Sequence, residues 1–204
     1  MKTIDLKKER KALYTASAKK PVVLDVPAMN CLMVNGMGDP SGQAFLEAVG
    51  AMYGVAYTLK FTLKKERQID YPVMPLEGLW DAQDITDYKK GRRDRWQWTL
   101  FIGLPDVVTK KDVAQAREAA RKKAGTPAFP AVRFERFAEG LSAQVMHIGP
   151  YAAEAPTIES LHRFVEEQGY ALRGLHHEIY LGDPRRAAPD KLKTIIRHPV
   201  KRKR

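Results

Sequence analysis

The chain has 204 residues, of which 44% are hydrophobic, and it carries a formal net charge of +11. This composition is typical of a globular protein with a buried core and excludes a chain that is disordered throughout. No apolar run approaches the roughly 18 residues of a membrane span, and the charged N-terminus lacks the apolar centre of a secretory signal, so we expect a soluble, cytoplasmic protein.

The positive charge is concentrated at the two ends of the chain. Residues 1–20 hold seven Lys or Arg against two acids, residues 185–204 hold nine against one, and the stretch between them is slightly acidic. We therefore predict basic tails at 1–20 and 201–204. Such tails allow weak, salt-dependent contact with nucleic acid, but solubility is their expected role, and no specific nucleic-acid or membrane partner is predicted.

Alternating hydrophobicity predicts eight strands, and apolar residues at helical spacing predict three helices. The predicted strands cover residues 22–26, 29–36, 69–77, 95–103, 131–137, 141–149, 174–181 and 192–200, and the predicted helices cover 42–58, 109–123 and 157–168. Thr109 and Asp112 have the spacing of a helix capping box. Two hairpins are expected, with turns at Pro27-Ala28 and Glu139-Gly140.

The two halves of the chain follow the same order of elements. Each half reads strand, strand, helix, strand, strand, and each helix is accompanied by a glycine, Gly54 in the first half and Gly169 in the second. We expect a single domain made of repeat 1 at about 21–104, a linker helix at about 109–123 and repeat 2 at about 130–200. The predicted fold class is α+β, in which two pseudo-symmetric strand-helix-strand-strand modules form an antiparallel eight-stranded sheet with helices on one face and a ligand groove between the repeats.

Several kinds of site are not supported by residue spacing. The glycine-rich stretch 36–42 lacks the spacing of a dinucleotide loop, and Pro40 removes a backbone donor from it, so we interpret it as a turn and a helix start. His176 and His177 are adjacent on a strand and point to opposite faces, which prevents joint chelation. The single Cys31 excludes an intrachain disulfide and a cysteine zinc site. No metal or cofactor is predicted.

The stretch "GLHHEIYLGDPRR" contains the main candidate residues. On a strand, His177 and Ile179 share one face with two leucines, whereas His176, Glu178 and Tyr180 share the other face, which is either a wet surface or the lining of a pocket. Aligning "PLEGLW" with "HHEIYL" sets Glu77 over Glu178, so two acids are expected at the groove. A glutamate walled by aromatic rings has a raised pKa and can act as a general acid or base; an exposed surface acid is the alternative.

Aromatic residues provide a second candidate feature. Trp96 and Trp98 lie on one face of a predicted strand, and Trp80 lies near the end of another. These side chains either fill a core or wall a cleft for a flat ligand. Such a cleft would also include Tyr71, Tyr151 and Tyr180.

The segments "MYGVAYTLKF", "YPVMPLEGLW", "RWQWTLFIGLPDVVT" and "HHEIYLGDPRRAAPDKLKTIIRHPV" resemble the GyrI-like small-molecule-binding family, in particular its stand-alone bacterial members. The resemblance extends from about Pro21 onward. It implies two fused strand-helix-strand-strand modules, a groove for drug-like molecules between them, and Glu178 as the ligand-facing acid. Some stand-alone members hydrolyse the cyclopropane ring of DNA-alkylating cyclopropanoid natural products, whereas other members are drug-binding domains of transcription activators or protect gyrase.

The chain departs from the activator members of this family at its N-terminus, and from many relatives at one aromatic position. Twenty residues before the domain are too few for a helix-turn-helix, which favours a stand-alone hydrolase or binder. Asp81 stands where many relatives carry a second tryptophan.

The resulting hypothesis is a protein that binds flat, aromatic, electrophilic compounds and adds water to a cyclopropane ring. Glu178 and Tyr180 are the expected catalytic residues, and the expected ligand-binding residues are Trp80, Trp98, Tyr71, Tyr151, Glu77 and His176. The alternative is a module that sequesters drugs or senses a ligand without turnover. Either a monomer or a homodimer is compatible with the sequence.

Overall fold

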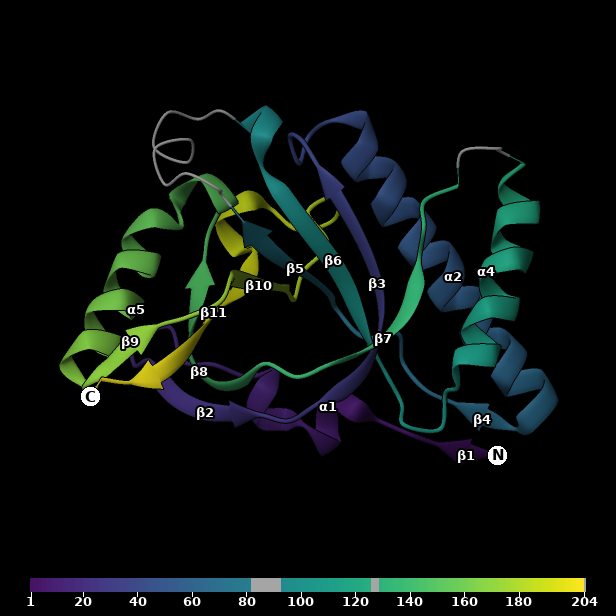
Figure 1. Cartoon of the computed structure of the whole chain (residues 1–204), viewed down its shortest axis with the longest axis horizontal. Coiled ribbons are helices and arrows are strands. Elements are labelled where there is room, and N and C mark those ends of the chain that lie inside the picture. Colours follow the sequence, from purple (N-terminus) through teal and green to yellow (C-terminus); the bar gives the residue numbers. More distant parts are fainter. Residues whose placement is uncertain (82–92, 126–128, 204) are drawn as a thin grey trace. The chain divides into compact units, whose positions relative to one another are not determined.

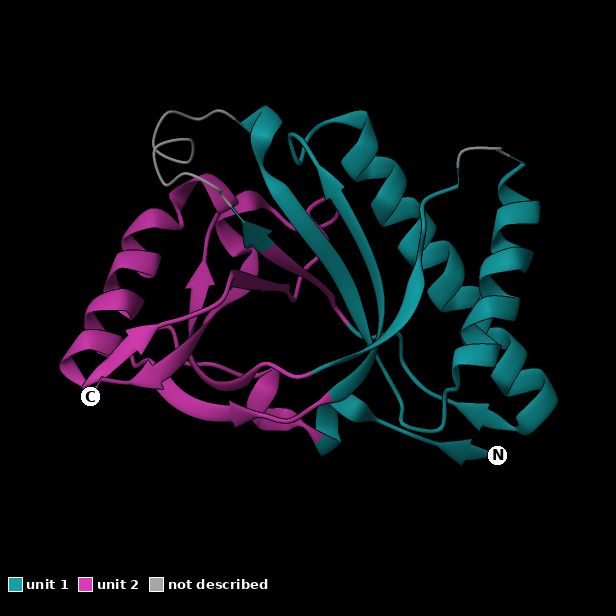
Figure 2. Cartoon of the chain, in the orientation of Figure 1, with its two compact units in different colours: residues 1–9, 29–74, 80–137 teal, residues 10–28, 75–79, 138–204 magenta. Residues whose placement is uncertain are grey.

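The structure, a computed structural model, describes residues 1–81, 93–125 and 129–203 (Figure 1). It has an α+β fold with antiparallel strands, as predicted. The chain forms two compact units that alternate along the sequence (Figure 2). Unit 1 contains Met1–Glu9, Met29–Met74 and Trp80–Phe137, and unit 2 contains Arg10–Ala28, Pro75–Leu79 and Ala138–Arg204.

Unit 1 packs two long helices against antiparallel strands. The strand order is β6 (Gln97–Leu104), β3 (Met29–Met37) and β7 (Arg133–Phe137), with the end of β5 (Leu76–Asp81) beside β6. Helix α2 (Gln43–Arg67) contacts β3 and β6, and α4 (Lys110–Ala124) contacts α2 and β7. The buried face of α2 repeats every three or four residues, which places it on one side of the helix. Its buried residues are Ala48, Ala51, Met52, Val55, Ala56, Leu59 and Leu63.

Unit 2 packs one helix against a second set of strands. Their order is β2 (Val22–Val26), β8 (Gly140–Ile148), β11 (Lys193–Arg202), β10 (His176–Tyr180) and the start of β5, and β9 (Tyr170–Leu172) also pairs with β11. Helix α5 (Ala155–Glu167) packs Leu161 and Val165 into the core formed with β8 and β11. The buried members of this core are Ala143, Val145, Leu161, Val165, Ile196 and Val200.

The short elements lie at the ends and in the connections. They are β1 (Lys2–Thr3), α1 (Leu6–Glu9), η1 (Lys11–Leu13), β4 (Ile69–Asp70), η2 (Arg93–Arg95), η3 (Tyr151–Ala153) and η4 (Pro189–Lys191). No helix in the described ranges is long and apolar enough to span a membrane.

The two predicted hairpins do not form. Strand β2 pairs with β8 rather than with β3, and β7 pairs with β3 rather than with β8. A two-residue hairpin turn requires positive φ angles. Proline fixes φ near −65° at Pro27, and Gly140, which does have a φ of 73°, already pairs with Val26 as the first residue of β8.

Two element boundaries also differ from the prediction. The helix predicted for 42–58 runs on to Arg67 and ends at Gln68, which has the left-handed conformation. The strand predicted for 69–77 is broken between β4 and β5, because Pro72 and Pro75 cannot donate ladder hydrogen bonds. The α4 capping box is confirmed, since Thr109 and Asp112 each accept from the other's backbone N–H.

The ends of the chain are folded, which corrects the prediction of basic tails. Strand β1 pairs with β4, and Leu6, Leu13 and Tyr14 are buried, whereas the lysines between them are exposed. At the other end, Lys201 and Arg202 extend β11 and pair with β9. Of the predicted tail 201–204, Arg204 lies outside the described residues.

A buried network of charged side chains holds unit 2 together. His177 lies between two glutamates, with Nδ1 3.0 Å from Glu139 and Nε2 3.1 Å from Glu77. Glu139 also accepts from Arg197 at 3.3 Å, and Tyr14 donates to Glu77 at 3.1 Å. Because the His, Arg and Glu side chains are only 1% exposed, each charge depends on its partners rather than on water.

The pKa directions agree with this pairing. Burial opposes ionisation of Glu139, but the charges and hydrogen bonds of His177 and Arg197 outweigh it and lower the pKa of Glu139. Burial likewise disfavours protonated His177, but Glu139 and Glu77 outweigh it and raise the pKa of His177. The network therefore contains an ionised carboxylate beside a protonated imidazole.

Replacing Glu139 by glutamine is expected to lower the free energy of unfolding by about 3–5 kcal/mol, because the charges of His177 and Arg197 lose a buried counter-ion. Urea denaturation at pH 7 measures the loss. Glu135→Gln on the exposed side of β7 is the matched control and is expected to change stability by less than about 1 kcal/mol. Equal effects of the two substitutions would contradict this role for Glu139.

Candidate functional site

Strand β10 presents a polar face and a buried face, as the alternation predicted. Glu178 pairs with Ile196 of β11, and Ile196 belongs to the core under α5, so the face of Glu178 is the face covered by that helix. His176 and Tyr180 share this face by strand periodicity. His177 and Ile179 point the other way, where His177 joins the buried charge network.

Glu178 is held by its two neighbours on the strand. Its Oε1 lies 3.1 Å from Nε2 of His176, and Tyr180 donates its hydroxyl to Oε2 at 2.8 Å. The Glu178 side chain is 15% exposed, so it still reaches solvent. A carboxylate with both oxygens fixed in this way has a defined direction for receiving a proton.

Glu154 is the second acid of the site. It precedes α5 and is only 4% exposed, and its Oε1 has no hydrogen-bond partner among the described residues. Burial, together with the nearby charge of Glu178, raises the pKa of Glu154 to about 9. Glu154 is therefore protonated at neutral pH, and the pair combines a carboxylic acid that can donate with a carboxylate that can accept.

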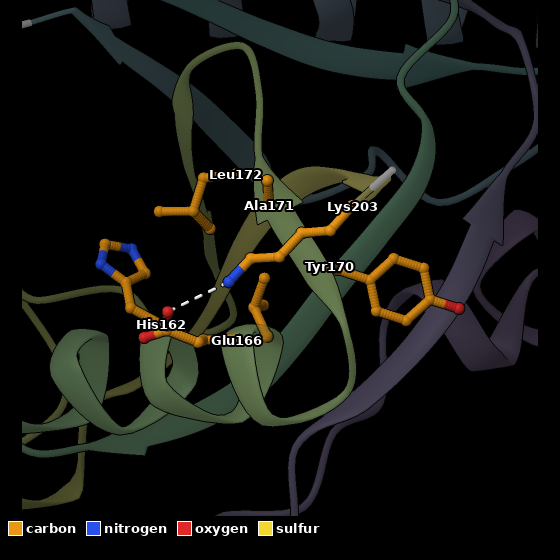
Figure 3. A pocket seen from close by; sticks show the side chains of 7 residues that line it. His162, Glu166, Tyr170, Ala171, Leu172 and Lys203 are labelled. Carbon is orange, nitrogen blue, oxygen red and sulfur yellow. Dashed lines mark hydrogen bonds and ion pairs between the residues drawn. The ribbon is translucent and has the colours of Figure 1, made fainter.

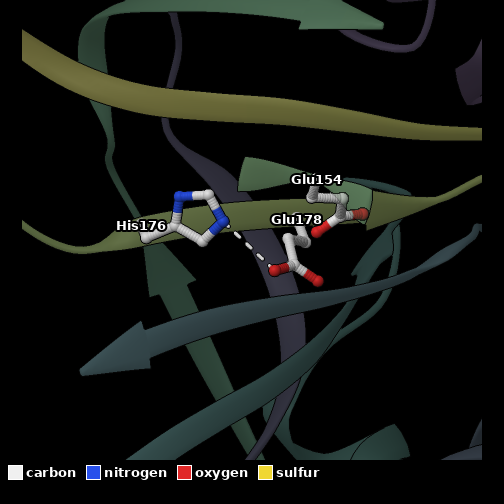
Figure 4. Close-up of side chains that lie close together, drawn as sticks. All are labelled: Glu154, His176 and Glu178. Carbon is white, nitrogen blue, oxygen red and sulfur yellow. Dashed lines mark hydrogen bonds and ion pairs between the residues drawn. The ribbon is translucent and has the colours of Figure 1, made fainter. Parts of the chain in front are cut away.

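The same side chains have the composition of a cation site. One ligand atom each from Glu154, His176 and Glu178 falls within 4.8 Å of the others (Figure 4). Two carboxylates and an imidazole suit a divalent transition metal as well as they suit a shared proton. Either a metal ion or a proton can therefore balance the negative charge of the two carboxylates.

An aromatic pair borders the two acids. The rings of Tyr151 and Tyr180 meet edge to face with their centroids 5.6 Å apart. Tyr151 is 39% exposed. The pair offers a flat ligand a contact surface near the carboxylates.

A second aromatic cluster lies in unit 1. Phe45 of α2 stacks on Trp80 at 5.8 Å and meets Trp98 edge to face at 5.2 Å, and Trp96 lies 6.0 Å from Trp80. Trp98 is 3% exposed and packs over Gly36, where an added Cβ would come within 2.0 Å of its ring. Trp98 is therefore a core residue, whereas Trp80 is partly exposed.

Glu77, which the sequence assigned to the site, lies elsewhere. Glu77 contacts His177 and Tyr14, which places it on the face of β10 opposite to Glu178. The alignment that set Glu77 over Glu178 therefore does not match the faces of the two strands, because an odd shift in register exchanges the faces of a strand. Shifting it by one sets Glu77 over His177 and Trp80 over Tyr180.

The ring of Tyr71, which the sequence also assigned to the site, is buried and does not offer a ligand a contact surface. It is 2% exposed, and Nζ of Lys60 lies 5.7 Å from the centroid of its ring. Burial and the charges of Asp112 and Asp70 raise the pKa of Tyr71 far above its usual range. Its hydroxyl has no hydrogen-bond partner in the described part of the chain.

The sequence analysis missed Glu154. Its segment "YAAEAPT" carries the signal of a helix start, an acid followed by Pro at the second helical position, but no spacing connects it with Glu178. Only the packing of α5 on β11 brings the two together.

A row of histidines leads away from Glu178. The rings of His176 and His198 are 6.2 Å apart, and those of His198 and His162 are 5.3 Å apart. Burial and the neighbouring imidazoles lower the pKa of His198 to about 3, so it is neutral at pH 7. His162 also borders a shallow depression of about 220 Å³ beside the Glu166–Lys203 ion pair (Figure 3).

We expect Glu154→Gln to become increasingly stabilising as the pH rises. The folded-state pKa of Glu154 is raised to about 9 from 4.5. The contribution of protonated Glu154 to the free energy of unfolding is therefore fully present below pH 4.5 and is lost as the pH rises through 9. Glutamine keeps the neutral form at every pH. Urea denaturation between pH 5 and 9 is expected to show a growing advantage for the variant, at most about 1.4 kcal/mol per pH unit. The exposed Glu159→Gln on the same helix should show a constant difference, and a constant difference for Glu154→Gln would contradict the assignment.

Comparison with known proteins agrees with this architecture. A structure described as a hydrolase from Listeria innocua is 40% identical, with a TM-score of 0.84, and the match covers 97% of this chain and 100% of that one. An uncharacterized conserved protein from Listeria innocua is 41% identical, with a TM-score of 0.85 and the same coverage. The EcmrR C-terminal domain, at 12% identity, shares the fold with a TM-score of 0.57 over 90% of this chain and 98% of its own.

No curated protein matches the chain. The model of the GyrI-like small molecule binding domain matches residues 19–201, which is most of the sequence. The chain therefore belongs to the GyrI-like family of small-molecule-binding domains.

Proposed function

We propose that this protein is a hydrolase that binds flat, electrophilic small molecules and adds water to a strained ring, with cyclopropanoid DNA-alkylating compounds as the substrate class. The observation that carries the proposal is the pair of carboxyl groups on the α5 face of unit 2. Glu154 holds a proton at neutral pH, and Glu178 beside it is oriented by His176 and Tyr180.

The pair supplies both proton transfers that ring opening needs. Glu178 accepts a proton from a water molecule whose oxygen forms a bond to a cyclopropane carbon. The adjacent carbon–carbon bond breaks, its electron pair moves into the conjugated carbonyl group, and Glu154 protonates the resulting oxygen. The product gains one water, and transfer of the proton from Glu178 to Glu154 restores the enzyme.

Aromatic side chains are proposed to bind the ring system of the substrate. Tyr151 and Tyr180 lie beside the acids, where their rings meet edge to face and Tyr151 is 39% exposed. Trp98 is assigned to the core of unit 1, where it packs over Gly36. Glu77 and Tyr71 are assigned structural roles instead, because both are buried.

The relatives support a hydrolytic activity. The Listeria innocua protein described as a hydrolase matches almost the whole chain at 40% identity. A binding module without turnover, which sequesters a drug or senses it, is the second candidate. Aromatic side chains alone would suffice for binding, whereas the protonated Glu154 beside Glu178 favours a catalytic function.

Turnover of a cyclopropanoid tests the proposal. Mass spectrometry is expected to show many product molecules per protein, each heavier by one water. Glu178→Gln should lower the rate by roughly 10²–10⁴-fold, since it removes the proton acceptor. Glu159→Gln, exposed on α5, is the control and should keep the full rate. Stoichiometric binding of the compound without product would contradict the hydrolase and leave a binding module as the function. Loss of the activity after treatment with EDTA would show that the cluster of Figure 4 works with a metal instead of a proton.

The rate should also fall at high pH. Because the pKa of Glu154 is raised to about 9, the general acid is present below that pH and is lost above it. We expect kcat/KM to be level from pH 7 to 8 and to decline tenfold per unit above about pH 9. A rate that keeps rising to pH 10 would exclude Glu154 as the proton donor.

A further inference from the structure

Helix α2 exposes an aromatic ridge. Its inner face fills the core of unit 1, but Leu46, Tyr57 and Phe61 on the outer side are 57%, 47% and 58% exposed. The rings of Tyr53, Tyr57 and Phe61 stack along the helix, with successive centroids 6.3 Å apart. A helix on a protein surface usually presents polar residues to water, so an exposed ridge of this kind indicates a contact surface.

Two glycines adjoin the ridge. Gly50 and Gly54 are exposed in the interior of α2, and a Cβ added to either would have no neighbour within 4 Å. Glycine in the middle of a helix is less stable than alanine, and no residue in the described ranges packs closely against these positions to require it. Removal of the side chain does allow a second helix to approach the backbone.

The order of residues along this outer side is self-complementary. Exposed positions three or four residues apart form one line along α2, and this outer stripe consists of Glu47, Gly50, Gly54, Tyr57, Phe61 and Lys65. Read in the opposite direction, the stripe sets Glu47 against Lys65. It likewise sets Gly50 against Phe61 and Gly54 against Tyr57.

We propose that the outer stripe of α2 is a homodimer interface, in which the α2 helices of two copies of this chain pack antiparallel about a two-fold axis near residues 55 and 56. Each copy inserts Tyr57 and Phe61 over the glycines of the other, and each Glu47 meets a Lys65. A two-fold interface uses one patch twice, so it needs both halves of every contact within that patch. The outer stripe contains both halves of every contact. A partner of different sequence would not require this self-complementarity.

Charge reversal tests the pairing. Sedimentation of the full chain from about 1 to about 200 µM is expected to show a monomer–dimer equilibrium, as suits a small interface. Glu47→Lys and Lys65→Glu should each raise the dimer Kd roughly tenfold, because both ends of the interface then repel. The double variant should restore the wild-type Kd. Glu159→Lys makes the same charge change on an exposed position of α5 and should leave the Kd unchanged.

Gly54→Ala separates association from folding. The alanine should raise the unfolding temperature of the dilute monomer by about 2–4 °C, because it favours the helix. It should nevertheless weaken the dimer, and Gly54→Leu should abolish it, since the side chain occupies the space for Tyr57. A wild-type chain that stays monomeric over the whole concentration range would overturn the proposal. A dimer that is indifferent to these substitutions would also overturn it, because the contact would then lie on another surface.

Discussion

The ion pairing of His177 with Glu77 and Glu139 is the interaction on which the rest of unit 2 depends. It joins strands β5 and β10 with the loop before β8, and Arg197 extends it to β11 and to the carbonyl of Leu13. Buried charges are tolerated only when every partner is present. The network therefore requires the N-terminal segment to fold onto the strands, which is why a stretch rich in lysine is not a free tail.

The network also orients the candidate site on the opposite face of β10. Since side chains on a strand alternate, fixing His177 toward its glutamates turns Glu178 toward α5. Glu154 at the start of that helix lies beside Glu178, and burial together with the charge of Glu178 raises the pKa of Glu154. The two faces of β10 thus carry the charge network on one side and the proposed acid and base on the other.

The two units have different relations to function. Unit 2 contains both acids and the Tyr151–Tyr180 pair, so the proposed chemistry depends on its internal packing. Unit 1 contains the tryptophan cluster and the outer stripe of α2. Its Trp98 is a core residue because Gly36 leaves room for the ring, whereas Phe61 is 58% exposed.

Local patterns were sufficient to predict the α+β class, the capping box of α4 and the two faces of β10, because periodicity and capping depend on neighbouring residues. They also identified Glu178 with Tyr180 on one face.

Local patterns did not predict how the strands pair. Strands β2 and β3 are separated by only two residues, yet they pair with β8 and β7, because pairing depends on which strand edges meet in space. For the same reason only the tertiary structure assigned Glu77 to His177 and brought Glu154 to Glu178, because desolvation and charge act across space and leave no spacing in the sequence.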